Sequence, residues 1–267
     1  MNEDLNRLGL VDEDDIDLDE AALSLALLDH PGTDLDPYYD LLDTIEARLE
    51  IVGDDAHDPA ARADALAAVL AGEFGFVGDA ETYDDPDNAD LIRVLDRRRG
   101  LPVSLSILWV ATARRLGWSA DLLDVPGHVL VLIGADADPV IVDPFSAGIR
   151  VDRERLVALV QAFGEPDRAV THVAAMPNRA VLVRLLLNQA TRAEAAGQGR
   201  RALTLYRRMT LMAPGYGHGW WERARLELVD GDVAGARASL AAMLEITREP
   251  ALRARISGLL ASLAAAA

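Results

Sequence analysis

The 267-residue chain contains no cysteine. This absence excludes disulfide bonds, thiolate metal sites, iron–sulfur clusters and a cysteine nucleophile. The chain also contains no lysine, so all 26 of its basic residues are arginine. Without lysine it can form neither a Walker A phosphate-binding loop nor a Schiff base with a carbonyl substrate or a pyridoxal cofactor. We therefore expect no cofactor.

Basic residues are scarce overall, since 44 acidic residues against 26 basic ones give a net charge of −18. Nucleic-acid binding requires clustered basic residues, so we expect no nucleic-acid partner. Residues 1–19 lack the basic and apolar regions of a signal peptide, and no apolar run approaches the roughly 18 residues that span a membrane. We expect a cytoplasmic protein without membrane contact, and the high alanine and arginine content suggests a bacterial source.

The charge is divided unevenly along the chain. Residues 1–149 hold 9 arginines and 33 acidic residues, a net charge of −24, whereas residues 150–267 hold 17 arginines and 11 acidic residues, a net charge of +6. This asymmetry indicates two units with different properties. Two explanations remain open: the units attract each other and dock, or the acidic unit presents a surface to a separate partner.

Apolar periodicity predicts a helical protein with a small sheet. Helical spacing is found in residues 17–28, 37–50, 59–70, 90–96 and 152–163. Residues 101–117 are apolar nearly all round, as in a buried helix, and Pro102 suits its first position. The pattern then changes to the two-residue period of strands, which we expect at residues 120–125, 128–133 and 140–142.

The last third of the chain repeats at an interval of 34 residues. The matched pairs are Gly197 and Gly231, Ala190 and Ala224, Ala202 and Ala236, and Met209 and Met243. A 34-residue period with small residues where helices cross is typical of tetratricopeptide (TPR) repeats. We predict two such repeats and a capping helix near residues 251–263, and we expect this segment to bind a protein partner.

Three aromatic residues of the repeats are candidate protein-binding residues: Trp220, Trp221 and Tyr206. The two tryptophans either fill the interior of the repeat or form an aromatic platform on its concave face, where a peptide would bind.

His128 and Asp143 are predicted to lie close together. If the second and third strands form a hairpin with an even-length loop, Asp143 lies opposite Leu130. Side chains alternate along a strand, so His128 and Asp143 share one face as diagonal neighbours. An imidazole oriented by a carboxylate is two-thirds of a nucleophilic triad.

A buried helix followed by a histidine strand and an aspartate strand resembles the transglutaminase-like core, a variant of the papain-type fold. More narrowly, the chain resembles SirB-type transglutaminase-like proteins, which carry a C-terminal TPR segment. The resembling residues are Tyr83, Asp85, Asn88, Arg98, Gly100, Pro102 and Gly127, together with the segments 100–106, 113–117, 126–128 and 143–145. The chain departs from the family pattern at Ala89, where serine is usual, and at Val129, where phenylalanine is usual.

The resemblance implies an α+β fold with three parts. Residues 1–15 would be an acidic, flexible tail. Residues 16–177 would be a transglutaminase-like domain, with N-terminal helices and a papain-type core that contains a small antiparallel sheet. Residues 178–267 would be the all-α TPR unit.

The family's nucleophile is a cysteine at the start of the buried helix, where this chain offers Pro102 or Ser104. One hypothesis is a non-catalytic accessory or regulatory protein, in which Ser104 supports the loop backbone. The alternative is a hydrolase or acyltransferase with a Ser104–His128–Asp143 triad, which requires direct contact between Ser104 and His128. The other histidines lack metal-ligand spacing, so we expect no metal site.

Overall fold

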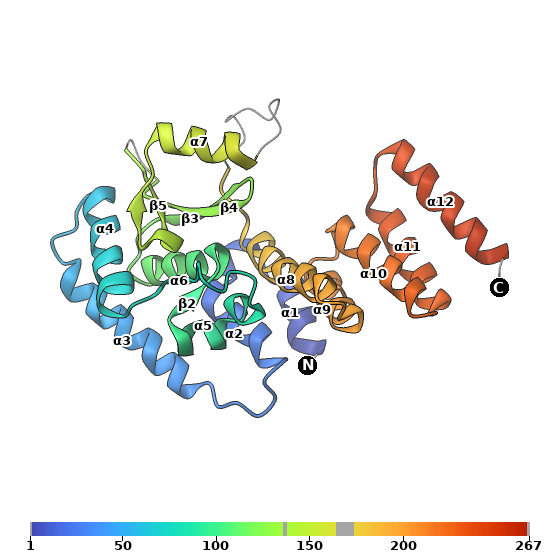
Figure 1. The fold of residues 1–267 in the computed structure, drawn as a ribbon, viewed down its shortest axis with the longest axis horizontal. Coiled ribbons are helices and arrows are strands. Elements are labelled where there is room, and N and C mark those ends of the chain that lie inside the picture. The colour runs from blue at the N-terminus through green and yellow to red at the C-terminus, as the bar shows by residue number, and fades with distance from the viewer. Residues whose placement is uncertain (1, 136–137, 164–173, 266–267) are drawn as a thin grey trace. The chain divides into compact units, whose positions relative to one another are not determined.

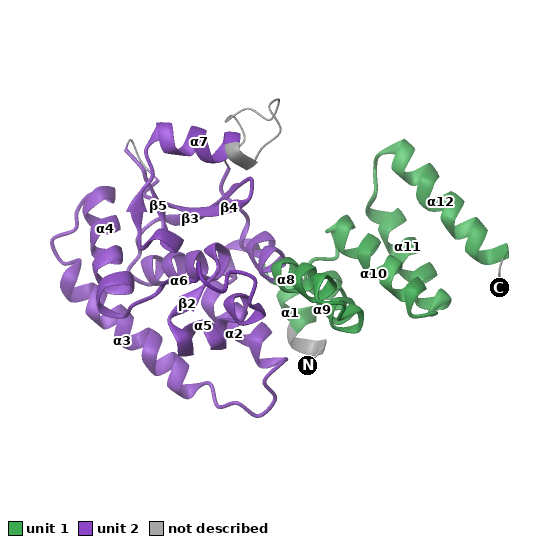
Figure 2. Cartoon of the chain, in the orientation of Figure 1, with its two compact units in different colours: residues 1–12, 186–267 green, residues 13–185 purple. Residues whose placement is uncertain are grey.

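A computed structural model of the protein describes residues 2–135, 138–163 and 174–265 (Figure 1). The chain divides into two compact units, one formed by residues 13–185 and the other by residues 1–12 and 186–267 (Figure 2). The division falls within helix α8 (Asn178–Ala195), eight residues later than the boundary expected after residue 177.

The unit of residues 13–185 combines helices with a small antiparallel sheet. Its helices are α2 (Leu18–Leu27), α3 (Asp36–Val52), α4 (Pro59–Leu66), the π-helix η2 (Ala67–Glu73), α5 (Leu91–Arg97), α6 (Pro102–Arg115) and α7 (Arg153–Phe163), with 3-10 turns η1 (Glu13–Asp15), η3 (Pro86–Ala89) and η4 (Pro144–Ser146). The sheet contains β3 (Ala120–Val125), β4 (His128–Ile133), β5 (Val140–Asp143) and β6 (Ile149–Arg150) in that order, and β1 (Val77–Gly78) pairs in parallel with β2 (Arg99–Gly100). The predicted strands and the predicted helix after residue 101 are thus confirmed.

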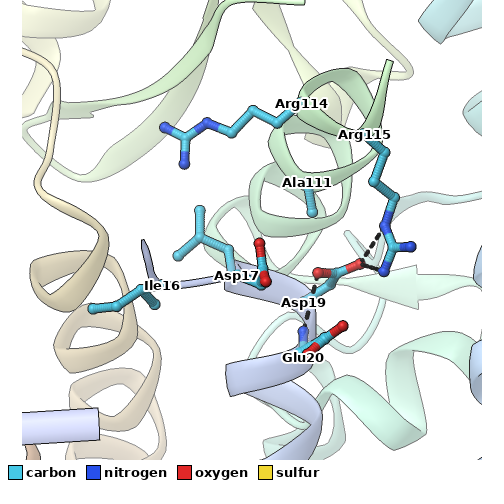
Figure 3. Close-up of a pocket in the computed structure, with 8 residues that line it drawn as sticks. Ile16, Asp17, Asp19, Glu20, Ala111, Arg114 and Arg115 are labelled. Atoms are coloured by element: carbon cyan, nitrogen blue, oxygen red, sulfur yellow. Dashed lines mark hydrogen bonds and ion pairs between the residues drawn. The ribbon is translucent and has the colours of Figure 1, made fainter. Parts of the chain in front are cut away.

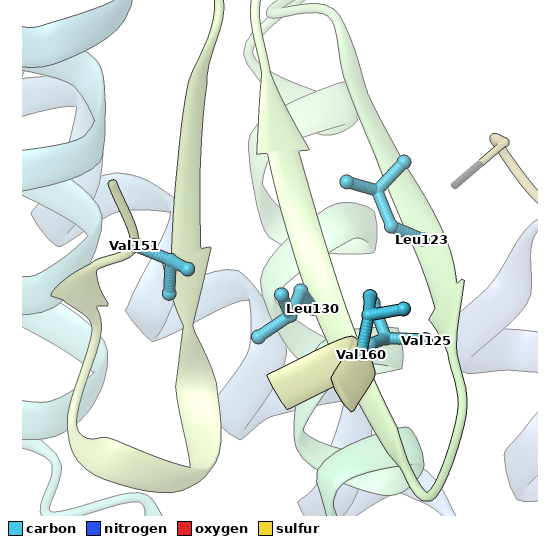
Figure 4. Close-up of a cluster of buried hydrophobic side chains, with 5 residues drawn as sticks. All are labelled: Leu123, Val125, Leu130, Val151 and Val160. Carbon is cyan, nitrogen blue, oxygen red and sulfur yellow. The ribbon is translucent and has the colours of Figure 1, made fainter. Parts of the chain in front are cut away.

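The sheet is covered on both faces, with α6 on one side and α7 on the other (Figure 1). Alternation along the strands decides which residues meet α7. Leu123, Val125 and Leu130 form a buried apolar cluster with Val160 of α7 and with Val151 (Figure 4). Burying apolar side chains contributes about 1.5–3 kcal/mol for each residue. This cluster therefore fixes α7 against the strands that carry the histidine and the aspartate.

Helix α6 is the central buried helix of this unit. It is buried from Pro102 to Ala113, and its first residue is a proline whose missing N–H would be unpaired at that position in any case. Its last turn carries Arg114 and Arg115, which suit the negative end of the helix dipole. Gly117 follows in the left-handed region, with φ +70°, and ends the helix.

The second unit is all helical in the residues described. Its helices after α8 are α9 (Gly199–Met212), α10 (Gly217–Val229), α11 (Val233–Ile246) and α12 (Pro250–Ala265). A buried cluster of Ala224, Ala236, Leu240, Met243 and Ile256 joins the last three of these helices. No described helix is long and apolar enough to cross a membrane.

The N-terminal segment differs from the flexible tail expected over residues 1–15. It contains helix α1 (Asn2–Leu10), which packs against α9. Gly9 lies so close to α9 that a β-carbon there would be 2.8 Å from the Leu211 carbonyl oxygen. Leu5 is buried, so apolar burial compensates for the cost of ordering this short helix.

Candidate functional site

The site is centred on His128 and Asp143, which strands β4 and β5 bring together. Val131 pairs with Val142, the register predicted from the hairpin. The His128 Nε2 atom lies 3.0 Å from Asp143 Oδ1, within hydrogen-bond distance. An ionised carboxylate only accepts hydrogen bonds, so Nε2 carries the proton that joins the pair.

Asp143 is almost fully buried and accepts several hydrogen bonds. Its Oδ1 accepts from the Phe145 and Ser146 main-chain N–H groups at 3.1 and 3.4 Å, and its Oδ2 accepts from the Ser146 hydroxyl at 2.8 Å. Burial opposes ionisation, but the hydrogen bonds from His128 and Ser146 outweigh burial and hold the pKa of Asp143 below its usual value. The carboxylate is therefore charged near neutral pH and orients the imidazole.

Phe145 closes one side of the pair. Its ring makes edge contacts with the His128 imidazole and with the Tyr83 ring, at centroid distances of 6.2 and 5.7 Å. A β-carbon at Gly78 would lie 2.4 Å from the Phe145 ring, so glycine is required there. The tyrosine and the Asp143-Pro144-Phe145 segment of the resemblance thus meet at this ring.

Ser104 lies in the first turn of α6, two residues after Pro102, and is fully buried. Its hydroxyl donates to the Asn88 carbonyl at 2.7 Å and lies 3.1 Å from the Leu101 carbonyl. A β-carbon at Gly100 would approach the Ser104 oxygen to 2.7 Å. Ser104 thus connects the start of the helix to the loop that contains Asn88.

The structure brings His128 and Asp143 together but gives Ser104 other partners. Within the described part of the chain, no hydrogen bond joins Ser104 to His128. His128 pairs with Val125, a member of the cluster under α7, so it belongs to the sheet face that α7 covers. Ser104 belongs to α6, on the opposite face (Figure 1). The described geometry therefore does not form the triad contact.

The acidic loop before α5 is organised by Arg97. Its guanidinium lies 3.1 Å from Asp79, 3.6 Å from Asp85 and 3.9 Å from Asp87. Hydrogen bonds from the Thr82 hydroxyl and main chain lower the pKa of Asp79 despite its burial. The arginine thus supplies the positive charge within this cluster. Nowhere in the described ranges are three or more His, Asp or Glu side chains arranged to hold a metal ion.

The remaining motif residues shape turns around the site. Arg98 ends α5 in the left-handed region, with φ 58°, and its guanidinium stacks 4.5 Å above the Phe76 ring. Gly127 occupies the turn between β3 and β4 with φ 74°, a value that favours glycine. These residues position the backbone of the loops on either side of α6 and β4.

Sequence reasoning missed two partners of Asp143. Ser146 donates to its carboxylate, and Arg155 of α7 lies 4.0 Å from it. The first has a local signal, because a serine three residues after an aspartate is a common side-chain turn. The second depends on how α7 packs on the sheet and has no local signal.

The three aromatic candidates lie in the all-helical unit. Tyr206 is 2% exposed and donates its hydroxyl to Glu194, so its side chain offers no surface to a partner. Trp220 and Trp221 are partly buried against the cluster that joins α10, α11 and α12. Arg223 and Arg255 cover their rings at 5.2 and 4.7 Å. Internal packing accounts for most of this aromatic surface.

Comparison with known proteins shows which family this chain resembles. Residues 36–187 match the family model described as the transglutaminase-like superfamily. The chain belongs to the transglutaminase-like superfamily. The transglutaminase-like match begins with α3 and contains the whole His128–Asp143 site and the start of α6.

Curated relatives extend the similarity beyond the transglutaminase-like match. A UPF0162 protein of Xylella fastidiosa strain 9a5c is 30% identical over 249 residues, which cover 90% of this chain and 88% of the relative. A UPF0162 protein of Xylella fastidiosa strain Temecula1 is 32% identical over 191 residues, 68% of this chain and 67% of the relative. A UPF0162 protein of Vibrio cholerae is 32% identical over 145 residues, 53% of this chain and 54% of the relative.

Proposed function

We propose that this chain is a non-catalytic transglutaminase-like protein that acts as an accessory or regulatory factor and binds a protein partner through a C-terminal TPR module. We place it with the SirB-type proteins because the motif residues from Tyr83 to Phe145 follow their pattern. We further propose that it performs this role in the cytoplasm.

The observation that carries the non-catalytic proposal is the environment of Ser104. An attacking hydroxyl must be reachable by substrate and must pass its proton to a base. The Ser104 hydroxyl is 0% exposed and donates to a main-chain carbonyl. Pro102, at the position where the family resemblance implies a nucleophile, has no reactive side chain.

The hydrogen bond between His128 and Asp143 favours a second candidate, a hydrolase or acyltransferase. This pair has the geometry of a base and its orienting carboxylate. Such an enzyme would still require Ser104 to exchange the Asn88 carbonyl for the imidazole. We favour the non-catalytic function because that exchange would require the fully buried Ser104 hydroxyl to give up its hydrogen bonds to the Asn88 and Leu101 carbonyls.

The activity test uses Ser104→Ala and His128→Ala in the full-length chain, with activated acyl esters and amides as substrates. We expect all three proteins to turn over these substrates at the background rate. Circular dichroism establishes whether each variant is folded. An activity of the wild type that both folded variants lose equally would overturn the non-catalytic proposal, since triad members act as one unit.

Repeated positions in the all-helical unit support the TPR proposal. Gly197 and Gly231 both adopt positive φ, at 73° and 82°, in the turns before α9 and α11. The other residues at the 34-residue interval are buried in both members of each pair: Ala190 and Ala224, Ala202 and Ala236, and Met209 and Met243. Equal conformation and burial at this interval are expected of two stacked copies of one structural repeat.

Exposed apolar side chains near the turn between α10 and α11 provide a test of partner binding. Val229 is 78% exposed and Val233 is 37% exposed. The full-length wild type is used to capture a partner protein from lysate. We expect the double variant Val229→Glu/Val233→Glu to capture much less of that protein. The matched control is Ile51→Glu, which alters a 69% exposed side chain in the other unit. Loss of capture in the control alone would contradict the proposed role of the C-terminal helices.

A further inference from the structure

Most arginines that the structure describes in the unit of residues 13–185 have carboxylate partners. Arg115 is an example, because it donates to Asp19 at 2.9 and 3.2 Å on the wall of a cavity of about 190 Å³ between α2 and α6 (Figure 3). Arg97 lies beside three aspartates in a similar way. An arginine without a carboxylate partner is therefore an exception in this acidic unit.

Arg98 and Arg99 are two such exceptions, and they are consecutive in the chain. No ion pair joins either guanidinium group to a carboxylate in the part of the chain that the structure describes. Arg99 is exposed, and only its Nη1 atom donates, to the main-chain carbonyls of Gly75 and Arg98 at 3.2 and 3.3 Å. Its Nη2 and Nε atoms thus remain available to a ligand.

The Arg98 guanidinium is partly buried and lacks a hydrogen-bond acceptor. It lies over the ring of Phe76, a fully buried residue, at 4.5 Å from the ring centroid. Its Nη1 atom is buried and has no acceptor among the described residues. Burial lowers the pKa of Arg98, and the negative charge of Asp96 only partly opposes this effect. A desolvated cation of this kind is stabilised when an anion approaches the part of the group that is still exposed.

Both guanidinium groups lie at the segment formed by Gly75 and Phe76. Arg99 donates to the Gly75 carbonyl, and Arg98 stacks on the ring of the next residue, Phe76. The parallel pairing of β1 with β2 holds this segment in place, because Val77 is the partner of Arg99. A β-carbon at Gly75 would meet no atom within 4 Å, so the space beside the segment is open. Two cationic groups thus flank one short segment with room for a ligand beside it.

The acidic residues close to this segment in the sequence are engaged elsewhere. Glu73 accepts two hydrogen bonds from Arg48, at 2.6 and 2.9 Å. Asp96 accepts a hydrogen bond from the Tyr38 hydroxyl at 3.1 Å and lies 3.8 Å from Arg93. The two positive charges at Gly75 are therefore not neutralised by these carboxylates.

We propose that Arg98 and Arg99 bind the phosphate group of a small phosphomonoester beside Gly75. The dianion of a phosphomonoester matches the two positive charges, and its three terminal oxygens can accept hydrogen bonds from two separate guanidinium groups. A carboxylate carries one charge and two oxygens in a plane, which suit a single guanidinium group. This site is separate from the His128–Asp143 pair and from the C-terminal helices, so the inference does not depend on the function proposed above.

The test measures binding of phenyl phosphate to the full-length chain by isothermal titration calorimetry, with benzoate as the carboxylate analogue. We expect phenyl phosphate to bind and benzoate to bind about tenfold more weakly or less. Arg99→Gln should raise the Kd of phenyl phosphate about tenfold, as expected for the loss of charge-assisted hydrogen bonds. Arg98→Gln should have at least the same effect, and circular dichroism establishes whether this variant is folded. Arg99 is exposed, so its variant tests the proposal even if Arg98→Gln is unfolded.

The matched control is Arg153→Gln, which removes one exposed arginine from α7 in the same unit. We expect this control to change the Kd by less than about twofold, because isolated surface charges contribute little. Equal weakening by Arg99→Gln and Arg153→Gln would overturn the proposal, since it would indicate diffuse attraction to positive charge. Failure of phenyl phosphate to bind the wild type, or benzoate binding as tight as that of phenyl phosphate, would overturn the phosphate assignment. A phosphoserine peptide that binds more than about tenfold more tightly than phenyl phosphate would overturn the assignment to a small ligand.

Discussion

Asp143 is the residue on which the geometry around His128 depends. Its carboxylate joins the imidazole to the Phe145-Ser146 main chain and to the Ser146 hydroxyl. A buried carboxylate with these partners is stable only when it is ionised, because each partner donates a hydrogen bond to it. The conformation of the turn after β5 therefore depends on the negative charge of Asp143.

This coupling predicts a pH dependence of stability. The pKa of Asp143 is lowered in the folded state, so its ionisation stabilises the fold above the unfolded-state pKa of about 3.9. That contribution is lost as the pH falls through the folded-state pKa. We expect Asp143→Asn to be less stable than wild type at pH 6, and the difference to shrink below about pH 4.

Urea unfolding at a series of pH values measures this difference. Asp54→Asn is the control, because Asp54 is exposed and its loss should leave the acid limb of the stability curve unchanged. A difference between wild type and Asp143→Asn that stays constant from pH 6 to pH 3 would contradict the assigned role of the charge.

The sequence was sufficient to predict the His128–Asp143 pair but not the partners of Ser104. Strand alternation and the hairpin register are local properties, and they determine which residues share a sheet face. The contact of Ser104 with the Asn88 carbonyl depends instead on how a distant loop packs on α6. Spacing along the chain contains no information about that packing.

At the scale of elements, the turn of residues 143–148 packs tightly on α6. Gly148 has φ 79°, and a β-carbon there would lie 2.2 Å from the Trp109 ring. The ring belongs to a fully buried residue of α6 and has no room to move. Glycine is therefore needed at this position for both its backbone conformation and its small size.

Comparison of two alanine substitutions separates these two requirements. Gly117 also has positive φ, at +70°, but a β-carbon there meets nothing within 4 Å. Both Gly117→Ala and Gly148→Ala incur backbone strain, and only the second adds a steric clash. We expect Gly148→Ala to lower the free energy of unfolding by about 1–3 kcal/mol more than Gly117→Ala does. Equal costs would show that the turn moves away from Trp109.

Overpacking should also lower the thermal stability of the helix pairs in the C-terminal region. Ala202 in α9 and Ala236 in α11 are fully buried and 34 residues apart. Replacing either with leucine should force helices apart at a cost of about 1–3 kcal/mol and lower the Tm measurably. Ala241→Leu, at an exposed position of α11, is the control and should melt like wild type. If the buried variants also melt like wild type, the repeat assignment is wrong.

Apolar periodicity predicted the helices and strands in which apolar residues recur along the whole element. It failed for a helix that has few apolar residues. Helix α6 and strands β3 to β5 were predicted because their patterns are long and mostly apolar. Helix α1 was missed because its nine residues are largely polar, and only its packing on α9 stabilises it. The contact with α9 lies some two hundred residues away in sequence and leaves no local pattern.

At the scale of the whole molecule, charge differs sharply between the two units. Residues 13–185 hold 14 arginines and 34 acidic residues, whereas residues 1–12 and 186–267 together hold 12 arginines and 10 acidic residues. The first unit therefore has net repulsion among its carboxylates. In the second unit, the buried Glu227 lies 3.0 Å from Arg223 and 3.3 Å from Arg207. Salt screens such partly buried ion pairs less than it screens exposed charges.

This difference predicts opposite salt responses, which amide hydrogen exchange of the full-length chain can resolve. Raising NaCl from about 0.05 to 0.5 M shortens the screening length to a few ångströms and weakens repulsion between the exposed carboxylates of α3. Exchange in α3 should slow by a few-fold, while exchange in α10 should stay constant or rise slightly. The exposed Arg48–Glu73 pair opposes this effect, but ion pairs between exposed side chains contribute little to stability. Faster exchange in α3 at high salt would mean that ion pairs, rather than net repulsion, dominate the acidic unit.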